Sequence, residues 1–165
     1  MKYNIILKKL SLLLLSLTLM TSFVSCEEDD VTPEPNGVLT DDVRGTWVVD
    51  MYWDGDFYDH NTISTLNTGD NDADKIWIDD QGHGWGLLAK VNFDPNTLTF
   101  SATDADEHYY GVTVTINGSI TKGGATTPSG ETVDSIHFEV EFSDIPGEPW
   151  IYEGYKSTAK IEDYP

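Results

Sequence analysis

Histidine is the side chain of this sequence best suited to acid–base chemistry, and it occurs at four positions: His60, His83, His108 and His137. Hydrolysis through a serine requires a hydroxyl, a histidine and a carboxylate held together. The histidines stand far apart in the sequence, and no Gly-x-Ser-x-Gly nucleophile elbow accompanies them. His83 lies between two glycines and close to Asp79 and Asp80, which makes it the best candidate for an acid or base. An ordinary turn residue is the favoured interpretation of His83, so we predict no catalytic residue.

Three aspartates, Asp70, Asp72 and Asp74, alternate at the spacing that opens a calcium-binding loop. A complete loop has glycine at its sixth position and glutamate at its twelfth. Lys75 occupies the glycine position here, and no glutamate follows at the twelfth. The three aspartates are therefore weak candidates for metal ligands, and a solvated acidic loop is the favoured interpretation. The sequence indicates no cofactor.

Aromatic side chains give the stronger functional signal, because the chain contains 5 Trp, 8 Tyr and 6 Phe. Rings with polar groups nearby can line a pocket for an apolar or amphipathic ligand. The candidates for ligand contact are Trp53, Trp77, Trp85, Tyr109, Tyr110 and Trp150. Ordinary core packing accounts for at least half of them in the alternative interpretation, and the sequence leaves open which rings face a cavity.

Residues 1–25 have the composition of an export signal. Basic residues near the start precede the mostly apolar residues 10–24, a stretch too short for a stable membrane span. Cys26, the single cysteine of the chain, follows Phe23-Val24-Ser25, an arrangement that resembles a bacterial lipobox. We therefore expect a lipoprotein signal peptide over residues 1–25 and a lipid on Cys26. A secretory signal with an incidental cysteine is the alternative.

An acidic run, Glu27-Glu28-Asp29-Asp30, comes directly after Cys26 and resembles the export signal that places lipoproteins of the Bacteroidetes on the outer face of the outer membrane. Residues 26–39 also contain two prolines and a glycine, so we predict an acidic tether there. The formal net charge of −20 would repel phosphate backbones and anionic headgroups alike. We expect no nucleic-acid partner, and we expect the lipid on Cys26 to hold the protein at the cell surface.

Residues 40–165 have the size and pattern of one all-β domain. The predicted strands are 45–58, 75–79, 85–93, 98–103, 109–117, 119–122, 135–143 and 150–159. The alternation is cleanest over 135–143, where every second residue is apolar. Residues 59–74 are expected to form a long polar loop with Ile63 and Leu66 tucked inward. About eight short strands separated by turns predict a closed antiparallel barrel or a sandwich.

Gly45-Thr46-Trp47, before a long first strand, resembles the opening of lipocalin and calycin barrels, in which the tryptophan packs across the closed bottom. Further stretches, at 72–80, 90–93, 98–100, 127–130, 133–142 and 152–156, resemble the Bacteroidetes family of lipid-binding putative hydrolases, which are lipocalin-like lipoproteins. The resemblance covers nearly all of residues 40–165 and implies a lipocalin-like barrel. Lipocalins usually place an arginine of the last strand over the tryptophan, and the nearest equivalent here is Lys156.

Three functions remain open from these observations. The first is an outer-membrane surface lipoprotein whose barrel binds a small apolar or lipid-like ligand. The second is a hydrolase acting on a lipid or glycan through His83 and nearby acids. The third is a cell-surface adhesion or assembly module without a pocket. The surplus of rings and the lack of a recognisable catalytic motif favour the first, so we do not expect an enzyme.

Overall fold

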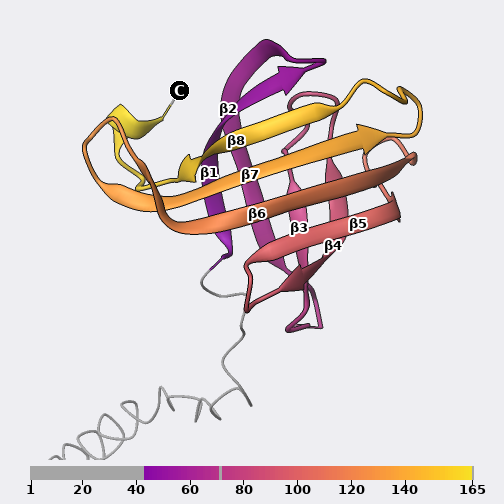
Figure 1. Ribbon diagram of the computed structural model, residues 1–165, viewed down its shortest axis with the longest axis horizontal. Helices are drawn as coiled ribbons and strands as arrows, with labels where there is room; N and C mark the ends of the chain where they lie inside the picture. Colours follow the sequence, from indigo (N-terminus) through magenta and orange to yellow (C-terminus); the bar gives the residue numbers. More distant parts are fainter. Residues whose placement is uncertain (1–42, 71, 165) are drawn as a thin grey trace, which may run out of the picture. The chain divides into compact units, whose positions relative to one another are not determined.

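The structure is a computed structural model that describes residues 43–70 and 72–164. These residues belong to a compact unit, 36–165, and form antiparallel strands, one short 3-10 helix and the connecting turns (Figure 1). The elements are β1 (Gly45–Trp53), β2 (Asp56–Asn67), β3 (Lys75–Asp79), β4 (Leu88–Asp94), β5 (Thr99–Asp106), β6 (Thr113–Thr126), β7 (Thr132–Phe142), β8 (Trp150–Lys156) and the helix η2 (Ile161–Asp163). Within the described residues, no helix is long and apolar enough to cross a bilayer. The predicted signal peptide 1–25, Cys26 and the tether 26–39 lie outside the described residues.

The eight strands close into a single barrel, as Figure 1 shows. Each strand pairs in antiparallel fashion with the next one in sequence, and β1 pairs with β8 to complete the ring. Closure gives every strand two neighbours and leaves no long sheet edge exposed. The prediction of an all-β antiparallel barrel of about eight strands is confirmed.

The prediction of one strand over 45–58 and a polar loop over 59–74 was wrong. Asp54 and Gly55 have φ values of 49° and 85°, so the chain reverses there in a two-residue hairpin. The strand β2 then runs through most of the predicted loop in register with β1. Ile63 points into the core, whereas Leu66 is exposed.

The predicted break at Gly118 was also wrong, because β6 continues through it as one strand. A Cβ atom at position 118 would lie 2.4 Å from the side chains of Phe100 and Phe138. The glycine therefore makes room for two core rings and does not end the strand. The two errors compensate, which is why the expected number of strands is still correct.

Side chains from all eight strands meet inside the barrel in one apolar cluster. The ring of Phe138 stacks on Tyr152 with centroids 4.6 Å apart and meets Phe100 edge to face at 5.8 Å. The alternation predicted for β7 is confirmed, since Ile136, Phe138, Val140 and Phe142 are all buried. Burial of this apolar surface is the main source of the barrel's stability.

One end of the barrel, where β1 begins and β8 finishes, is sealed by Trp47; we call it the closed end. Trp47 is fully buried, and its Nε1 donates a hydrogen bond to Thr65 Oγ1 at 2.9 Å. Thr65 in turn donates to the carbonyl oxygen of Val43. Lys156 places its Nζ 5.9 Å from the centre of the Trp47 ring, within the range of a cation–π contact. Lys156 therefore covers the first-strand tryptophan, although it lacks the planar group of an arginine.

Candidate ligand-binding rim of the barrel

The other end of the barrel carries four connections, at 54–55, 80–87, 107–112 and 143–149, which we call the rim. They gather at one end because the strands alternate in direction. Five of the six predicted ligand-contact rings lie on or beside the rim: Trp53, Trp85, Tyr109, Tyr110 and Trp150. The sixth, Trp77, lies on the outer face of β3, where it packs against His108 at 5.2 Å and Lys90 Nζ at 5.3 Å.

Trp150 is the buried ring against which the aromatic side chains of the rim pack. Its side chain is 1% exposed and stacks on Trp53, with ring centroids 6.1 Å apart, while Tyr58 meets it edge-on at 4.8 Å. Among the described residues, Trp150 Nε1 is the buried side-chain nitrogen or oxygen that has no hydrogen-bond partner. A buried donor without a partner costs free energy, so this indole lowers the stability of the rim end of the barrel.

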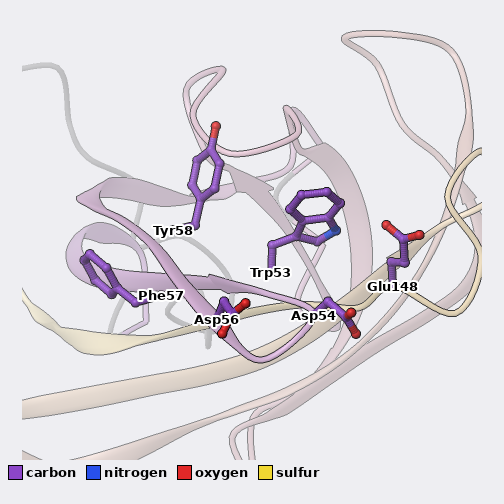
Figure 2. Close-up of a pocket in the computed structure, with 6 residues that line it drawn as sticks. All are labelled: Trp53, Asp54, Asp56, Phe57, Tyr58 and Glu148. Carbon is purple, nitrogen blue, oxygen red and sulfur yellow. The ribbon is translucent and has the colours of Figure 1, made fainter.

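A first pocket, the hairpin pocket, opens between the β1–β2 hairpin and the β7–β8 connection and has a volume of about 320 Å³. Its lining residues are Trp53, Asp54, Asp56, Phe57, Tyr58 and Glu148. Figure 2 shows the ring of Trp53 between Tyr58 and Glu148, with Phe57 pointing away to the other side. Sequence reasoning missed Phe57, Tyr58 and Glu148 as lining residues. The Asp54–Gly55 pair, a frequent hairpin turn, was the signal that could have placed the first two.

A second pocket, the loop pocket, has a volume of about 480 Å³. It is lined by Gly84, Trp85, Tyr110, Val112 and Asp144. Trp85 Nε1 donates to Asp144 Oδ2 at 3.3 Å, which ties the β3–β4 connection to the β7–β8 connection. Both pockets therefore border the segment between β7 and β8, and both present aromatic rings beside carboxylates.

The β3–β4 connection, 80–87, covers the rim end of the core. Gly84 has a φ of 56°, and a Cβ there would lie 2.9 Å from the Tyr152 hydroxyl and 3.1 Å from the Trp150 ring. Asp80, the first residue of this connection, is buried and accepts hydrogen bonds from Gly82 N at 3.0 Å and from the Tyr152 hydroxyl at 3.1 Å. Burial raises the pKa of Asp80 to about 6, and these donors offset the effect only in part.

Glu107 positions the two tyrosines of the β5–β6 connection. Its buried carboxylate accepts hydrogen bonds from the backbone N–H groups of Tyr109, at 2.6 Å, and Tyr110, at 2.7 Å. It also accepts one from Leu88 N at 3.2 Å, which links the connection to the start of β4. The hydroxyl of Tyr109 donates to Asp79 at 2.7 Å, so that ring is held on the rim from both ends.

His83 lies on the rim, in the β3–β4 connection, but its side chain has an amide as its neighbour. Its Nδ1 is 2.9 Å from Asn61 Nδ2, and no carboxylate of the described residues pairs with it. The histidines that do contact carboxylates, His60 with Asp50 and His137 with Glu153, lie on the outer faces of their strands. The geometry therefore gives His83 no group that would tune it for acid–base work.

A second polar cluster occupies the closed end, where Ser129 Oγ donates to Asp163 Oδ2 at 2.8 Å and Lys160 Nζ lies 3.4 Å from the same hydroxyl. The combination of serine, carboxylate and lysine has the residue types of a hydrolase. A hydrogen bond to Glu131 raises the pKa of Lys160, which keeps the amine protonated and unable to act as a base. The cluster instead fastens the C-terminal segment to the β6–β7 connection.

The three candidate metal ligands lie between β2 and β3, near the closed end. Asp72 Oδ2 accepts a hydrogen bond from the Thr68 hydroxyl at 3.1 Å, and the Asp72 N–H donates to the same hydroxyl at 2.9 Å. Over residues 43–70 and 72–164, no group of three or more His, Cys, Asp or Glu side chains is arranged to hold a metal ion. Asp70, Asp72 and Asp74 are thus not brought together as a ligand set in the described residues.

A closed antiparallel barrel of eight strands, sealed by a tryptophan at one end and lined with rings at the other, has the architecture of a lipocalin-like small-ligand-binding protein. The chain belongs to the family described as lipid-binding putative hydrolase, whose model matches residues 32–160. This confirms the family suggested by the sequence motifs. A comparison with curated proteins finds no match.

Proposed function

We propose that the protein is an outer-membrane surface lipoprotein whose barrel binds a small apolar or lipid-like ligand at the rim. The observation that carries the proposal is the distribution of exposed rings. Of the nine exposed large hydrophobic side chains among the described residues, six are rings on the rim: Trp53, Phe57, Tyr58, Trp85, Tyr109 and Tyr110. Exposed rings beside pockets are typical of a ligand site.

The packing inside the barrel supports a ligand position at the rim. Buried apolar side chains from all eight strands occupy the region between the strands, and Gly84 of the 80–87 connection lies close to Trp150 and Tyr152. The ligand therefore lies across the rim, with its apolar part against Trp85, Tyr110 and Val112 in the loop pocket. Membership of a lipid-binding family supports a lipid-like ligand.

Binding is tested by titrating residues 36–165 with a fatty acid and a lysophospholipid while tryptophan fluorescence is followed. The double variant Trp85→Ala/Tyr110→Ala is expected to weaken binding at least about tenfold, since two contact rings are removed. Trp77→Ala is the matched control, because this ring lies on the outer face of β3. The affinity of this variant for the ligand should equal that of the wild type. Equal losses in both variants would contradict the rim as the site.

The same titration separates the alternative functions when it is run beside hydrolysis assays on ester and glycoside substrates. We expect no turnover. Turnover that disappears in His83→Ala would establish the hydrolase instead, whereas neither binding nor turnover would favour an adhesion or assembly module. Ligand binding and turnover, measured together, distinguish the three functions.

The lipid anchor is tested on the full-length chain by metabolic labelling with a fatty acid. Cys26→Ala should abolish incorporation of the label, because the thiol that would carry the lipid is gone. Equal labelling of wild type and variant would contradict the lipoprotein assignment. Protease treatment of intact cells tests surface exposure, with cleavage of the barrel's connections expected only if they face outward.

A further inference from the structure

The hairpin pocket differs from an ordinary apolar pocket in its charge. Three of its six lining residues are aromatic and the other three are acidic: Trp53, Phe57, Tyr58, Asp54, Asp56 and Glu148. None of the lining residues is basic. The Asp54 N–H donates to the carbonyl oxygen of Pro149 at 3.2 Å, so the hairpin turn is held next to Glu148. Three carboxylates are thus gathered around one set of rings.

These carboxylates are uncompensated. Over the described residues, the side chains of Asp54, Asp56 and Glu148 make no hydrogen bond and no ion pair. Two acids elsewhere on the barrel do contact lysines: Asp134 lies 3.0 Å from Lys122, and Glu131 contacts Lys160. Like charges held together repel one another, and a bound cation would relieve that repulsion.

The rings of the pocket are held in place and remain accessible. Trp53 and Tyr58 both pack on the buried Trp150, which fixes their positions from below. Trp53 nevertheless stays 39% exposed and Tyr58 51% exposed. A fixed, exposed ring attracts a poorly hydrated cation through its electron-rich face. Inorganic cations prefer oxygen ligands and gain nothing from such rings, whereas organic ammonium groups gain from both rings and carboxylates.

We propose that the hairpin pocket binds a positively charged ammonium headgroup, so that the ligand of the rim is a cationic or ammonium-bearing amphiphile. This inference rests on the proposed function and adds the headgroup to it. Sugars also stack on rings, but they need donors as well as acceptors, and the donors lining this pocket are few, chiefly the Tyr58 hydroxyl and the Trp53 indole N–H. The excess of acceptors favours the ammonium group.

The experiment compares three amphiphiles with the same dodecyl tail, each below its micelle-forming concentration: dodecyltrimethylammonium, dodecyl maltoside and dodecyl sulfate. They are titrated into residues 36–165 with tryptophan fluorescence as readout. We expect the trimethylammonium head to bind about tenfold more tightly than the maltoside, and the sulfate to bind most weakly. Added salt should reduce the difference between heads.

The double variant Asp56→Asn/Glu148→Gln should lose most of the preference for the trimethylammonium head and keep its affinity for the maltoside. The matched control is Asp106→Asn/Glu139→Gln, which removes two exposed carboxylates away from the pocket and should keep the preference. Tyr58→Leu, which keeps the charges, should lower the affinity for the trimethylammonium head alone.

Each remaining outcome contradicts either the ammonium subsite or the proposed function. Equal affinity for the three heads, or loss of the preference in the control variant, overturns the ammonium subsite and leaves the lipid-binding function intact. Tightest binding of the maltoside overturns it in favour of a carbohydrate. Binding of none of the three amphiphiles contradicts the proposed function itself.

Discussion

At the closed end of the barrel, the buried carboxylate of Asp163 accepts hydrogen bonds from the Ser129 N–H, the Ser129 hydroxyl and the Thr158 hydroxyl. At the rim, the buried carboxylate of Asp80 accepts hydrogen bonds from Gly82 N–H and the Tyr152 hydroxyl, interacts with the backbone of Leu87, and lies beside Asp79. Burial by itself would raise the pKa of both carboxyl groups. For Asp163 the hydrogen bonds outweigh the effect of burial and leave the pKa below its ordinary value. For Asp80 the effect of burial is larger than that of the hydrogen bonds, and the pKa is raised.

The tryptophans of the two ends show the same difference. The indole N–H of Trp47 is bonded to Thr65, and that of Trp150 lacks a partner. The buried Trp47 and Asp163 of the closed end thus have hydrogen-bond partners, while the rim holds a buried indole donor without a partner and several exposed rings. An unsatisfied buried donor and exposed rings both cost stability, and such departures from full packing are typical of functional regions.

The largest effect is expected for Trp47→Ala, which empties the seal of the closed end. Loss of a fully buried tryptophan should lower the free energy of unfolding by about 3–5 kcal/mol. Thermal or urea unfolding of residues 36–165 measures it, with Trp77→Ala on the outer face as the comparison. A melt indistinguishable from the wild type would mean that Trp47 is no anchor.

Asp80→Asn at the rim should instead stabilise the barrel at neutral pH. The folded-state pKa of Asp80 is raised to about 6, so the folded protein loses stability as pH rises through the interval from about 4 to about 6. Asparagine avoids this loss, and we expect a gain of about 3 kcal/mol at pH 7 that largely disappears near pH 4. Unfolding of both proteins across that range is the measurement. A variant destabilised at pH 7 would show that the Asp80 carboxylate is stabilising in its ionised form.

Asp163→Asn should have the opposite sign and a smaller effect, since it releases only the C-terminal segment. The pKa of Asp163 is lowered in the folded state, so its contribution to stability is present above about pH 4 and is lost as pH falls below that value. The melting temperature of the variant should therefore fall below that of the wild type at pH 7, and the gap should close in acid. A gap that widens in acid would refute the assignment.

The smallest effect on stability is expected for Trp85→Ala. This ring is partly exposed on the rim, so the free energy of unfolding should change by less than about 1 kcal/mol while ligand affinity falls. The contrast with Trp47→Ala is the sharpest test of the division between the two ends. A loss of stability close to that of Trp47→Ala would remove the distinction.

Much of the fold followed from local patterns. The alternation in β7 predicted its buried face, and Gly45-Thr46-Trp47 predicted the anchor at the closed end. Local patterns failed at Gly118 and over β2. In β2, polar residues occupy a strand because pairing with β1 and β3 satisfies their backbone N–H and C=O groups. This pairing depends on distant segments, so local strand propensity does not predict it.

The sequence by itself determined the strand alternation, the acidic charge and the presence of surplus rings, because these depend on residue type and near neighbours. Only the tertiary structure decided which rings share a surface. Trp53, Tyr58 and Trp150 come from three strands, and barrel closure brings them together while it leaves Trp77 on the outer face. Likewise, burial at the rim end of the core, where Tyr152 of β8 donates a hydrogen bond to the carboxylate, raises the pKa of Asp80, because desolvation depends on what packs around a group in space.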